Sequence, residues 1–274
     1  MKIATLGPVG SFSYNAATQA FPKADIMTKH SIRETIASYE RGNEDYALIP
    51  IENSLEGSVN QATDALFHNS HASVVAEFIL PIQQNLLVAQ ENITPIQILS
   101  HPQALAQTRN FLQANYPEAT LEETDSTAQA AEYVANHPEK AIAAIAPLEA
   151  AETYHLLVAA ANIQDNDDNH TRFWLLGHEL PELFPLRIRE KKTSLALTLP
   201  DNLPGALHKA ISAFAWRGID MTKIESRPLK TVLGQYFFII DLADDPKIPY
   251  AIEELNALGV TTRLLGDYPI YLLA

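Results

Sequence analysis

The sequence segment richest in groups able to do chemistry follows an apolar run near residue 50. Glu52, Asn53 and Ser54 bring a carboxylate, a carboxamide and a hydroxyl together directly after ALIPI, residues 47–51, an apolar run typical of a buried strand. Open α/β sheets bind ligands beyond the carboxyl ends of their strands. These three side chains are therefore candidates for one wall of a ligand-binding cleft, where they could exchange protons and hydrogen bonds with a small molecule.

A second candidate is Thr-Arg-Phe at residues 171–173, which sets a hydroxyl, a fixed cation and an aromatic ring at the start of a predicted strand. The arginine could hold a carboxylate at two points, although a solvated loop entering a strand fits the spacing equally well. The preceding acidic residues suggest a calcium loop, but His170 stands where such a loop needs glycine and Leu176 where it needs glutamate. Calcium is therefore not expected.

Two turns between a predicted strand and a predicted helix add further polar groups. Ser11 lies in TLGPVGSFSYNAA, where the free N–H groups of a helix start could hold a carboxylate. Ser100, His101 and Gln107 lie in ILSHPQALAQ, which has the same layout. An ordinary capped turn and a structural histidine are the alternatives. Neither turn matches a nucleotide-binding loop, so a nucleotide is not indicated.

The elements that must position these groups alternate between strand and helix over the first 180 residues, which indicates an α/β fold. Residues 96–150 repeat the earlier layout when they are shifted by about 95 positions: Ser126 then falls on Ser31, and AAIAPLE at 143–149 on YALIPIE at 46–52. Chance similarity is the alternative to two related lobes. Two such lobes would hold a ligand between them.

A change of composition at about residues 178–192, with two prolines and several charges, predicts a linker. The remaining chain predicts the element order βαββαβ, a ferredoxin-like arrangement used by small-molecule sensing domains. The predicted domains are residues 1–180, in lobes of about 1–75 plus 165–180 and about 76–164, followed by residues 193–274.

Composition excludes several classes of protein. An apolar fraction of 47% with 19% charged residues describes a globular chain, and the absence of cysteine removes disulfides and thiol nucleophiles. No apolar stretch reaches the length of about 18 residues needed for a spanning helix, and no signal-peptide core follows the N-terminus. A net charge of −14 repels nucleic acid. We expect a cytoplasmic protein. We also expect no metal site, because the pair His68 and His71 has no cysteine to complete a set of ligands.

The motifs together resemble the prephenate dehydratase family with a C-terminal ACT regulatory domain. The resemblance rests on GPVGSFSYNAA, PIENSLEGSVNQATDAL, SHPQALAQTRNFL and TRF, followed by a βαββαβ segment that contains PGAL and ESRP. The spacing ENS-x-x-G-S-V with a downstream TRF is specific. The resemblance implies a two-lobed, periplasmic-binding-protein-like catalytic domain. We expect the single-activity form, since no segment offers room for a fused chorismate mutase domain.

The family resemblance implies a lyase of L-phenylalanine biosynthesis that converts prephenate to phenylpyruvate, carbon dioxide and water without a cofactor. The catalytic residues it implies are Thr171, Arg172, Phe173, Glu52 and Asn53, and the substrate-binding residues are Ser11, Ser54, Ser100, His101 and Gln107. Thr171 would assist the departing hydroxide. A threonine hydroxyl is a weak acid, so we predict that Thr171 is resupplied with a proton from Glu52, His101 or water.

The resemblance also implies feedback inhibition by L-phenylalanine across a subunit interface of a homodimer or homotetramer. The effector-binding residues it implies are Gly205, Ala206, Leu207, Glu225, Ser226, Arg227 and Pro228. His208 stands where many relatives have a hydrophobic or aromatic residue, and it could alter the strength of the response.

Two alternative functions remain open at the level of sequence. Arogenate dehydratase acts on a substrate with an amino group in place of the keto group, and no residue pattern separates the two. A non-catalytic amino-acid sensor would use the same cleft without forming product.

Overall fold

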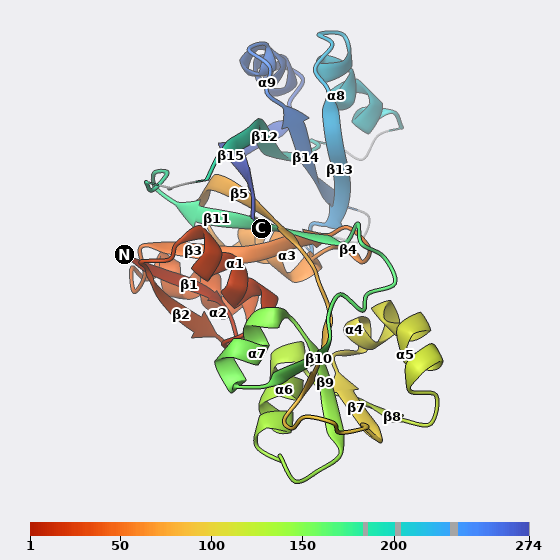
Figure 1. The fold of residues 1–274 in the computed structure, drawn as a ribbon. Helices are drawn as coiled ribbons and strands as arrows, with labels where there is room; N and C mark the ends of the chain where they lie inside the picture. The colour runs from red at the N-terminus through yellow and green to blue at the C-terminus, as the bar shows by residue number, and fades with distance from the viewer. Residues whose placement is uncertain (183–185, 201–203, 231–234, 274) are drawn as a thin grey trace. The chain divides into compact units, whose positions relative to one another are not determined.

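The computed structural model describes residues 1–182, 186–200, 204–230 and 235–273, which group into two units that interleave along the chain (Figure 1). The first, called the N-terminal unit, contains Met1–Ala62, Ile79–Phe173 and Leu273. The second, called the C-terminal unit, contains Thr63–Phe78 and Trp174–Leu272. Strands β5 (Ser73–Pro81) and β11 (His170–Gly177) run from one unit into the other. The predicted functional domain boundaries stay a prediction.

The first lobe of the N-terminal unit is built on a sheet in which β1 lies between β2 and β3, parallel to both, and β3 is followed by β11. Its elements are β1 (Lys2–Leu6), α1 (Phe12–Ala20), β2 (Asp25–Lys29), α2 (Ile32–Glu40), β3 (Tyr46–Asn53) and β4 (Gly57–Ser58). Five consecutive residues of β3, 47–51, are buried, as expected for a strand covered on both faces. The polar residues Glu52 and Asn53 end this strand.

The second lobe is a five-stranded sheet in the order β10-β6-β9-β7-β8. Its elements are β6 (Asn85–Val88), β7 (Gln97–Ser100), α4 (Pro102–Gln107), α5 (Arg109–Asn115), β8 (Thr120–Glu123), α6 (Thr127–Ala135), β9 (Ile142–Ala146), α7 (Leu148–Tyr154) and β10 (Leu157–Ala160). All of β9 is buried. Its side chains alternate between an apolar cluster with α6 and α7 and another with α4 and α5, which places helices on both faces of the sheet.

The two lobes share local structure where the sequence repeats. Ser31 caps α2 by accepting a bond from the N–H of Glu34, and Ser126 caps α6 in the same way from Gln129, each at 3.1 Å. In each case the side chain of the third helical residue accepts a bond from the backbone N–H of the residue before the cap, which is a capping box shifted by one residue. The two-lobed α/β architecture is confirmed.

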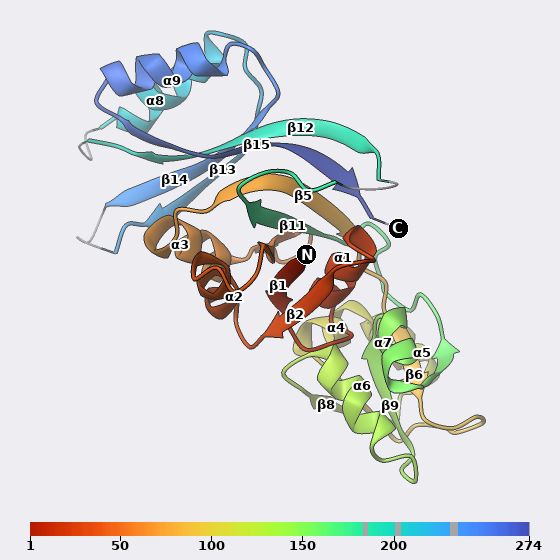
Figure 2. The ribbon, with the colours of Figure 1, turned by 90° about the vertical axis from the view of Figure 1, so that its left-hand side faces the viewer.

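The C-terminal unit contains the predicted order βαββαβ, arranged as an antiparallel sheet β13-β14-β12-β15. Its elements are β12 (Ile188–Thr198), α8 (Ala206–Ala215), β13 (Met221–Pro228), β14 (Tyr236–Ala243), α9 (Ile248–Ala257) and β15 (Thr261–Leu272). Both helices pack on one face of this sheet (Figure 2). The other face meets α3 (Asn60–Asn69), where the rings of Phe67 and Phe237 stack with centroids 3.7 Å apart.

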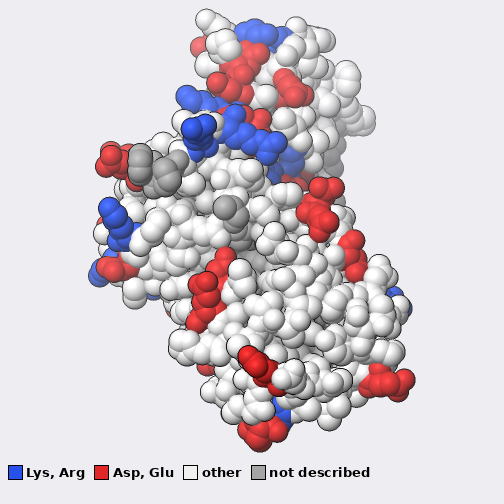
Figure 3. Space-filling model, in the orientation of Figure 1, with Lys and Arg blue, Asp and Glu red and all other residues white. Residues whose placement is uncertain are grey.

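The predicted linker ends too late. Strand β12 begins at Ile188, because residues 188–192 pair with β15 despite their charges, and only this non-local pairing makes them a strand. Figure 3 shows Lys and Arg residues gathered in a band over the region of β12. Arg189 and Lys191 of this strand are exposed, as is Arg187 just before it. Charges along an incompletely paired strand discourage edge-to-edge association. Residues 183–185 of the predicted linker lie outside the described residues, as do residues 201–203 and 231–234 of the predicted βαββαβ segment.

Candidate functional site

A cavity of about 1030 Å³ in the N-terminal unit is lined by residues from both of its lobes. Thr171, Asn53 and Phe173 line it from the first lobe, and His101 and Gln107 from the second. This volume lies at the upper end of the range typical of small-molecule sites. With Ser11, the structure thus brings together six residues that the sequence nominated from four distant segments.

Two helices direct their N-terminal turns at the cavity. Ser11 and Ser13 line it at the start of α1, and Ser126 and Thr127 line it at the start of α6. The first N–H groups of a helix have no partner within the helix, and they carry a partial positive charge that favours anions. The Ser11 hydroxyl itself accepts from Tyr14 N and donates to Leu6 O, both at 3.3 Å. These bonds hold the helix start in place, and the predicted contact of Ser11 with substrate stays a prediction.

Asn53 and Thr171 form the polar centre of the first lobe's wall. The Asn53 side-chain nitrogen donates to Thr171 Oγ1 at 3.0 Å and to the side-chain oxygen of Asn169 at 2.8 Å. Among the described residues no acceptor for the Thr171 hydroxyl hydrogen lies within bonding distance. This hydrogen is therefore available to a ligand in the cavity.

Asn169 is a cavity residue that the sequence reasoning missed. Its side chain is 1% exposed and links Asn53 to Gln107, whose side-chain oxygen accepts from the Asn169 side-chain nitrogen at 3.0 Å. Its spacing offered a signal, because residues 169, 171 and 173 share one face of an extended segment. In the sequence, Asn169 belongs to the acidic segment before Thr171 that suggested a calcium loop. Lysine and amide groups were missed as well, including Lys29 and Gln84.

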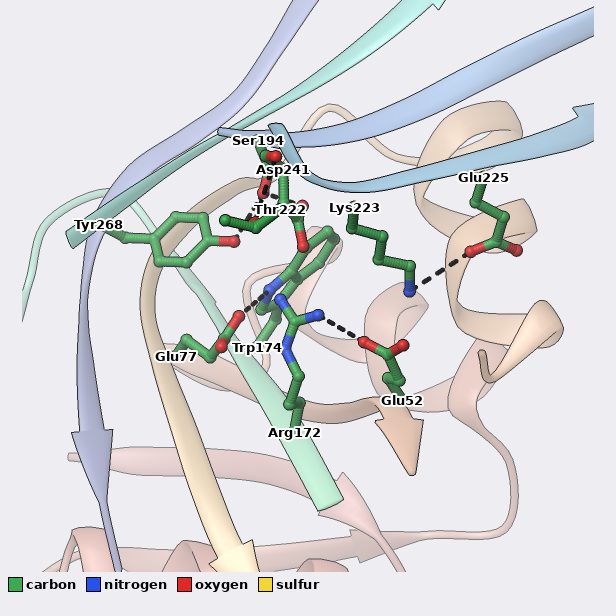
Figure 4. A network of polar contacts seen from close by, with 10 residues as sticks. All are labelled: Glu52, Glu77, Arg172, Trp174, Ser194, Thr222, Lys223, Glu225, Asp241 and Tyr268. Carbon is green, nitrogen blue, oxygen red and sulfur yellow. Dashed lines mark hydrogen bonds and ion pairs between the residues drawn. The ribbon is translucent and has the colours of Figure 1, made fainter. Parts of the chain in front are cut away.

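Glu52 and Arg172 stand outside the lining of the cavity. Successive residues of a strand point to opposite faces, so these two face away from the side on which Asn53 and Thr171 lie. There the Arg172 guanidinium donates to the Glu52 carboxylate at 2.5 Å (Figure 4). The predicted clamping of a substrate carboxylate by Arg172, and the predicted catalytic part of Glu52, stay predictions that this placement does not support directly.

Two predicted serines have structural partners. Ser54 is exposed and fastens β3 to β11, with its hydroxyl donating to Asp168 O at 3.1 Å and accepting from His170 N at 3.0 Å. Ser100 is fully buried and donates to Ile145 O at 2.6 Å. Neither lines the cavity. Their predicted contact with substrate stays a prediction. Their hydrogen bonds join neighbouring strands of each lobe: Ser54 joins β3 to β11, and Ser100 joins β7 to β9.

His101 lies on the wall of the second lobe as the N-cap of α4. Its Nδ1 accepts from Gln103 N at 3.3 Å, which leaves Nε2 as the ring nitrogen that carries hydrogen in the neutral form.

On the first lobe, Lys29 forms an ion pair with Glu44 at 2.8 Å. Burial alone would raise the pKa of Glu44, but hydrogen bonds from Lys29 and Ser38 and the charge of Lys29 lower it below its usual value. Part of the positive charge at this end of the cavity is thus compensated.

The predicted effector segments lie in the C-terminal unit. Gly205 caps α8 with a φ of +81°, a conformation that favours glycine, and Ala206 and Leu207 begin the helix. Glu225, Ser226, Arg227 and Pro228 end β13. Whether these seven residues bind an effector stays a prediction.

Arg227 faces α3 and holds Asp64 in a two-point contact, with bonds of 3.0 and 3.1 Å. Glu225 faces the same way and pairs with Lys223 (Figure 4). Helix α8 packs on the opposite face of the sheet, to which Ser226 and Pro228 point by strand alternation.

Within the described ranges, no cluster of three or more His, Cys, Asp or Glu side chains is arranged to hold a metal ion. None of the helices in that part of the chain combines the length and the apolar character needed to span a bilayer.

A two-lobed α/β unit with a cavity lined by hydroxyls, amides and helix starts, joined to a βαββαβ unit, defines a small-molecule-binding protein with a ferredoxin-like appendage. The family model described as prephenate dehydratase matches residues 3–181. The chain is 58% identical over 275 residues to the prephenate dehydratase of Lactococcus lactis subsp. lactis, which covers 99% of this chain and 98% of that protein. The chain therefore belongs to the prephenate dehydratase family.

Solved structures agree with this assignment. The prephenate dehydratase from Streptococcus mutans is 38% identical, with a TM-score of 0.65 over 99% of each chain. The prephenate dehydratase in complex with L-Phe from Arthrobacter aurescens is 33% identical, with a TM-score of 0.86 over 98% of this chain and 90% of that one.

Proposed function

We propose that this protein is a prephenate dehydratase that forms phenylpyruvate, carbon dioxide and water. The observation that carries the proposal is the placement of Thr171 and Asn53, both from motifs of the family resemblance, on the wall of one cavity. The family assignment and the identity of 58% to a prephenate dehydratase support it.

The reaction has simple requirements. The bond from the ring to its carboxylate breaks, its electrons form a ring double bond, and the ring carbon–oxygen bond breaks on the opposite side. The departing hydroxide takes up one proton and becomes water. Aromatisation supplies the driving force, so the protein needs to orient a dianion and to donate a hydrogen bond or proton to the leaving oxygen. The starts of α1 and α6 suit the dianion.

We assign the donation to Thr171. Its oxygen accepts from Asn53, so its hydrogen points elsewhere and is available to the leaving oxygen. Because the Glu52 carboxylate is bound by Arg172 outside the cavity lining, His101 or water is the better candidate for resupplying the proton. His101 lines the cavity, and a neutral imidazole with hydrogen on Nε2 could pass it on.

L-phenylalanine is the effector we propose for the C-terminal unit, which would act as an ACT domain. The relative from Arthrobacter aurescens was solved in complex with L-Phe, and it spans both units of this chain. We further propose a cytoplasmic homodimer or homotetramer that needs no cofactor and binds neither nucleic acid nor membrane. The predicted effector residues Glu225 and Arg227 lie on the face of the sheet opposite to α8, and we propose that a second copy completes the effector site.

The test is phenylpyruvate formation by the purified, metal-free protein, with prephenate and arogenate supplied in separate samples and phenylalanine added to a parallel prephenate sample. We expect turnover of prephenate and its loss on addition of phenylalanine. Preferential turnover of arogenate would reassign the substrate. Ligand-dependent changes without product from either compound would favour the sensor. Turnover that ignores phenylalanine would keep the reaction and reject the effector.

A further inference from the structure

We infer that Asn169 is a positioning residue that fixes the direction of a hydrogen-bond chain from Asn53 to Gln107, so that Gln107 presents a donor to the substrate. The inference rests on the proposed function and deepens it. This hydrogen-bond chain joins residues of both lobes: Asn53 ends β3, Asn169 precedes β11, and Gln107 ends α4.

The backbone sets the direction at Asn53. The Asn53 side-chain oxygen accepts from the N–H groups of Leu55 and Glu56 at 3.0 and 3.1 Å. A backbone N–H can only donate, so the oxygen of this amide must face residues 55 and 56. The nitrogen of the amide must then face the opposite way, toward Asn169 and Thr171.

Asn169 carries this direction across to the second lobe. Its side-chain group 2.8 Å from the Asn53 nitrogen must be an acceptor, which is the amide oxygen. Its nitrogen therefore faces Gln107, and the Gln107 group 3.0 Å away must in turn be the oxygen. The Gln107 side-chain nitrogen remains, buried and without a hydrogen-bond partner among the described residues, in a side chain that lines the cavity.

The result is a pair of donors at the two ends of one chain. Thr171 offers its hydroxyl hydrogen at one end, and Gln107 offers its amide hydrogens at the other. Prephenate carries two carboxylates, a keto group and a hydroxyl group that leaves as hydroxide, and all of these accept hydrogen bonds. If each hydrogen bond of this series had donor and acceptor exchanged, Gln107 would present its amide oxygen to these groups and repel them. A buried polar atom without a partner is costly in a folded protein, which is consistent with a partner supplied by the substrate.

Replacing Asn169 by aspartate reverses one end of the chain only. An aspartate carboxylate still accepts from Asn53, so the hydroxyl of Thr171 keeps its orientation. It cannot donate to Gln107, whose amide then turns to donate to the carboxylate and presents its oxygen to the cavity. We expect KM for prephenate to rise roughly 10- to 100-fold near neutral pH, the range for losing one hydrogen bond to a charged group, while kcat changes less than about threefold.

Lowering the pH should restore the variant. A protonated aspartic acid donates through its hydroxyl and accepts through its carbonyl, as asparagine does. Other titratable side chains lie nearby. His170 follows Asn169 in the chain, and the cavity is also lined by Lys29, His30, His101, Asp125, Glu132 and Tyr154. The profile is therefore read as the ratio of variant KM to wild-type KM, which should fall toward one with decreasing pH. The matched control is Asn166→Asp, an exposed position in the same loop whose side chain accepts from Asp168 N.

The experiment measures kcat and KM against pH for wild type, Asn169→Asp, Asn166→Asp, Gln107→Leu and the double variant Asn169→Asp/Gln107→Leu. Since Asn169 acts through Gln107, the double variant should have the KM of Gln107→Leu alone. If thermal unfolding shows that Asn169→Asp is not folded, Asn169→Ser replaces it, alone and combined with Gln107→Leu. Serine is too short to reach Gln107, so the Gln107 amide is free to turn.

Three outcomes would overturn the inference if wild type is active. The first is an unchanged KM for Asn169→Asp, and the second is a KM ratio that does not fall as the pH is lowered. The third is a double variant whose KM rises by the product of the two single effects. Absence of wild-type turnover would overturn the proposed function and this inference with it.

Discussion

Replacing Thr171 by valine tests the assigned proton donor with little change of shape. Valine keeps the branched side chain on β11 but has no hydroxyl, so it removes both the hydrogen offered to the cavity and the acceptor for Asn53. Thr171→Ser keeps both functions. The pair of variants therefore separates the loss of the hydroxyl from any change in packing.

The cost in stability should be small. The Asn53 nitrogen retains its 2.8 Å bond to Asn169, and the carbonyl of His170, already 3.3 Å away, can accept the second hydrogen. We expect a loss of about 1 kcal/mol, the net value of one hydrogen bond, and a melting temperature lower by about 2–4 °C. The effect on turnover should be larger. Loss of an acid or donor at the leaving group lowers kcat by about 10²- to 10⁴-fold, or about 3–5 kcal/mol.

The assay compares kcat for phenylpyruvate formation with the melting temperature for both Thr171 variants. Thr35→Val is a matched control, because Thr35 is fully buried on α2 and bonds the carbonyl of Ser31, outside the cavity lining. We expect this control to lose stability but not turnover. A folded Thr171→Val protein with near wild-type kcat would refute the assigned role, and a serine variant as slow as valine would argue against the hydroxyl as the essential group.

Three further predictions concern stability. Glu149→Ala removes hydrogen bonds of 3.0 and 3.1 Å that Asn15 and Gln19 donate to Glu149 and that join α1 to α7. The variant should have a melting temperature lower by about 2–4 °C and a higher KM, because the two lobes are held together less firmly, and unchanged values would contradict this. Burial alone would raise the pKa of Asp64, but hydrogen bonds from Lys230 and Arg227 lower it. The stability lost in Asp64→Asn, about 1–3 kcal/mol at pH 7, should therefore shrink as pH falls below about 4, and a loss independent of pH would refute the pairing. Gly266→Ala would place its Cβ 2.2 Å from the carbonyl oxygen of Val74 and should cost about 3 kcal/mol or more in chemical denaturation, so near wild-type stability would exclude this close approach.

The sign of the Asp64 effect follows from linkage. A carboxyl whose pKa is lower in the folded state stabilises the protein above its unfolded pKa, and this contribution is lost as pH falls through the folded pKa. The variant cannot titrate at this position. Wild type and variant therefore converge only at acidic pH, which a denaturant titration at several pH values would measure.

Local chemistry explains why most helices and strands were predictable from sequence. Ser11, Ser31 and Ser126 cap helices through bonds to residues three positions ahead, and Gly218 and Gly259 follow helix ends with positive φ values. These signals need no distant partner. The start of β12 was mispredicted because its charged residues become a strand only by pairing with β15, some 80 positions later.

The sequence by itself determined which polar groups are available for chemistry: the hydroxyl of Thr171, the amides of Asn53 and Gln107, and the imidazole of His101. Tertiary structure alone decided which of them share a cavity. Strand alternation shows that neighbours such as Thr171 and Arg172 point apart, but only the assembled lobes decide which side is the cavity. The chain of bonds through Asn169 joins groups 62 and 116 positions apart, and no local pattern specifies such contacts.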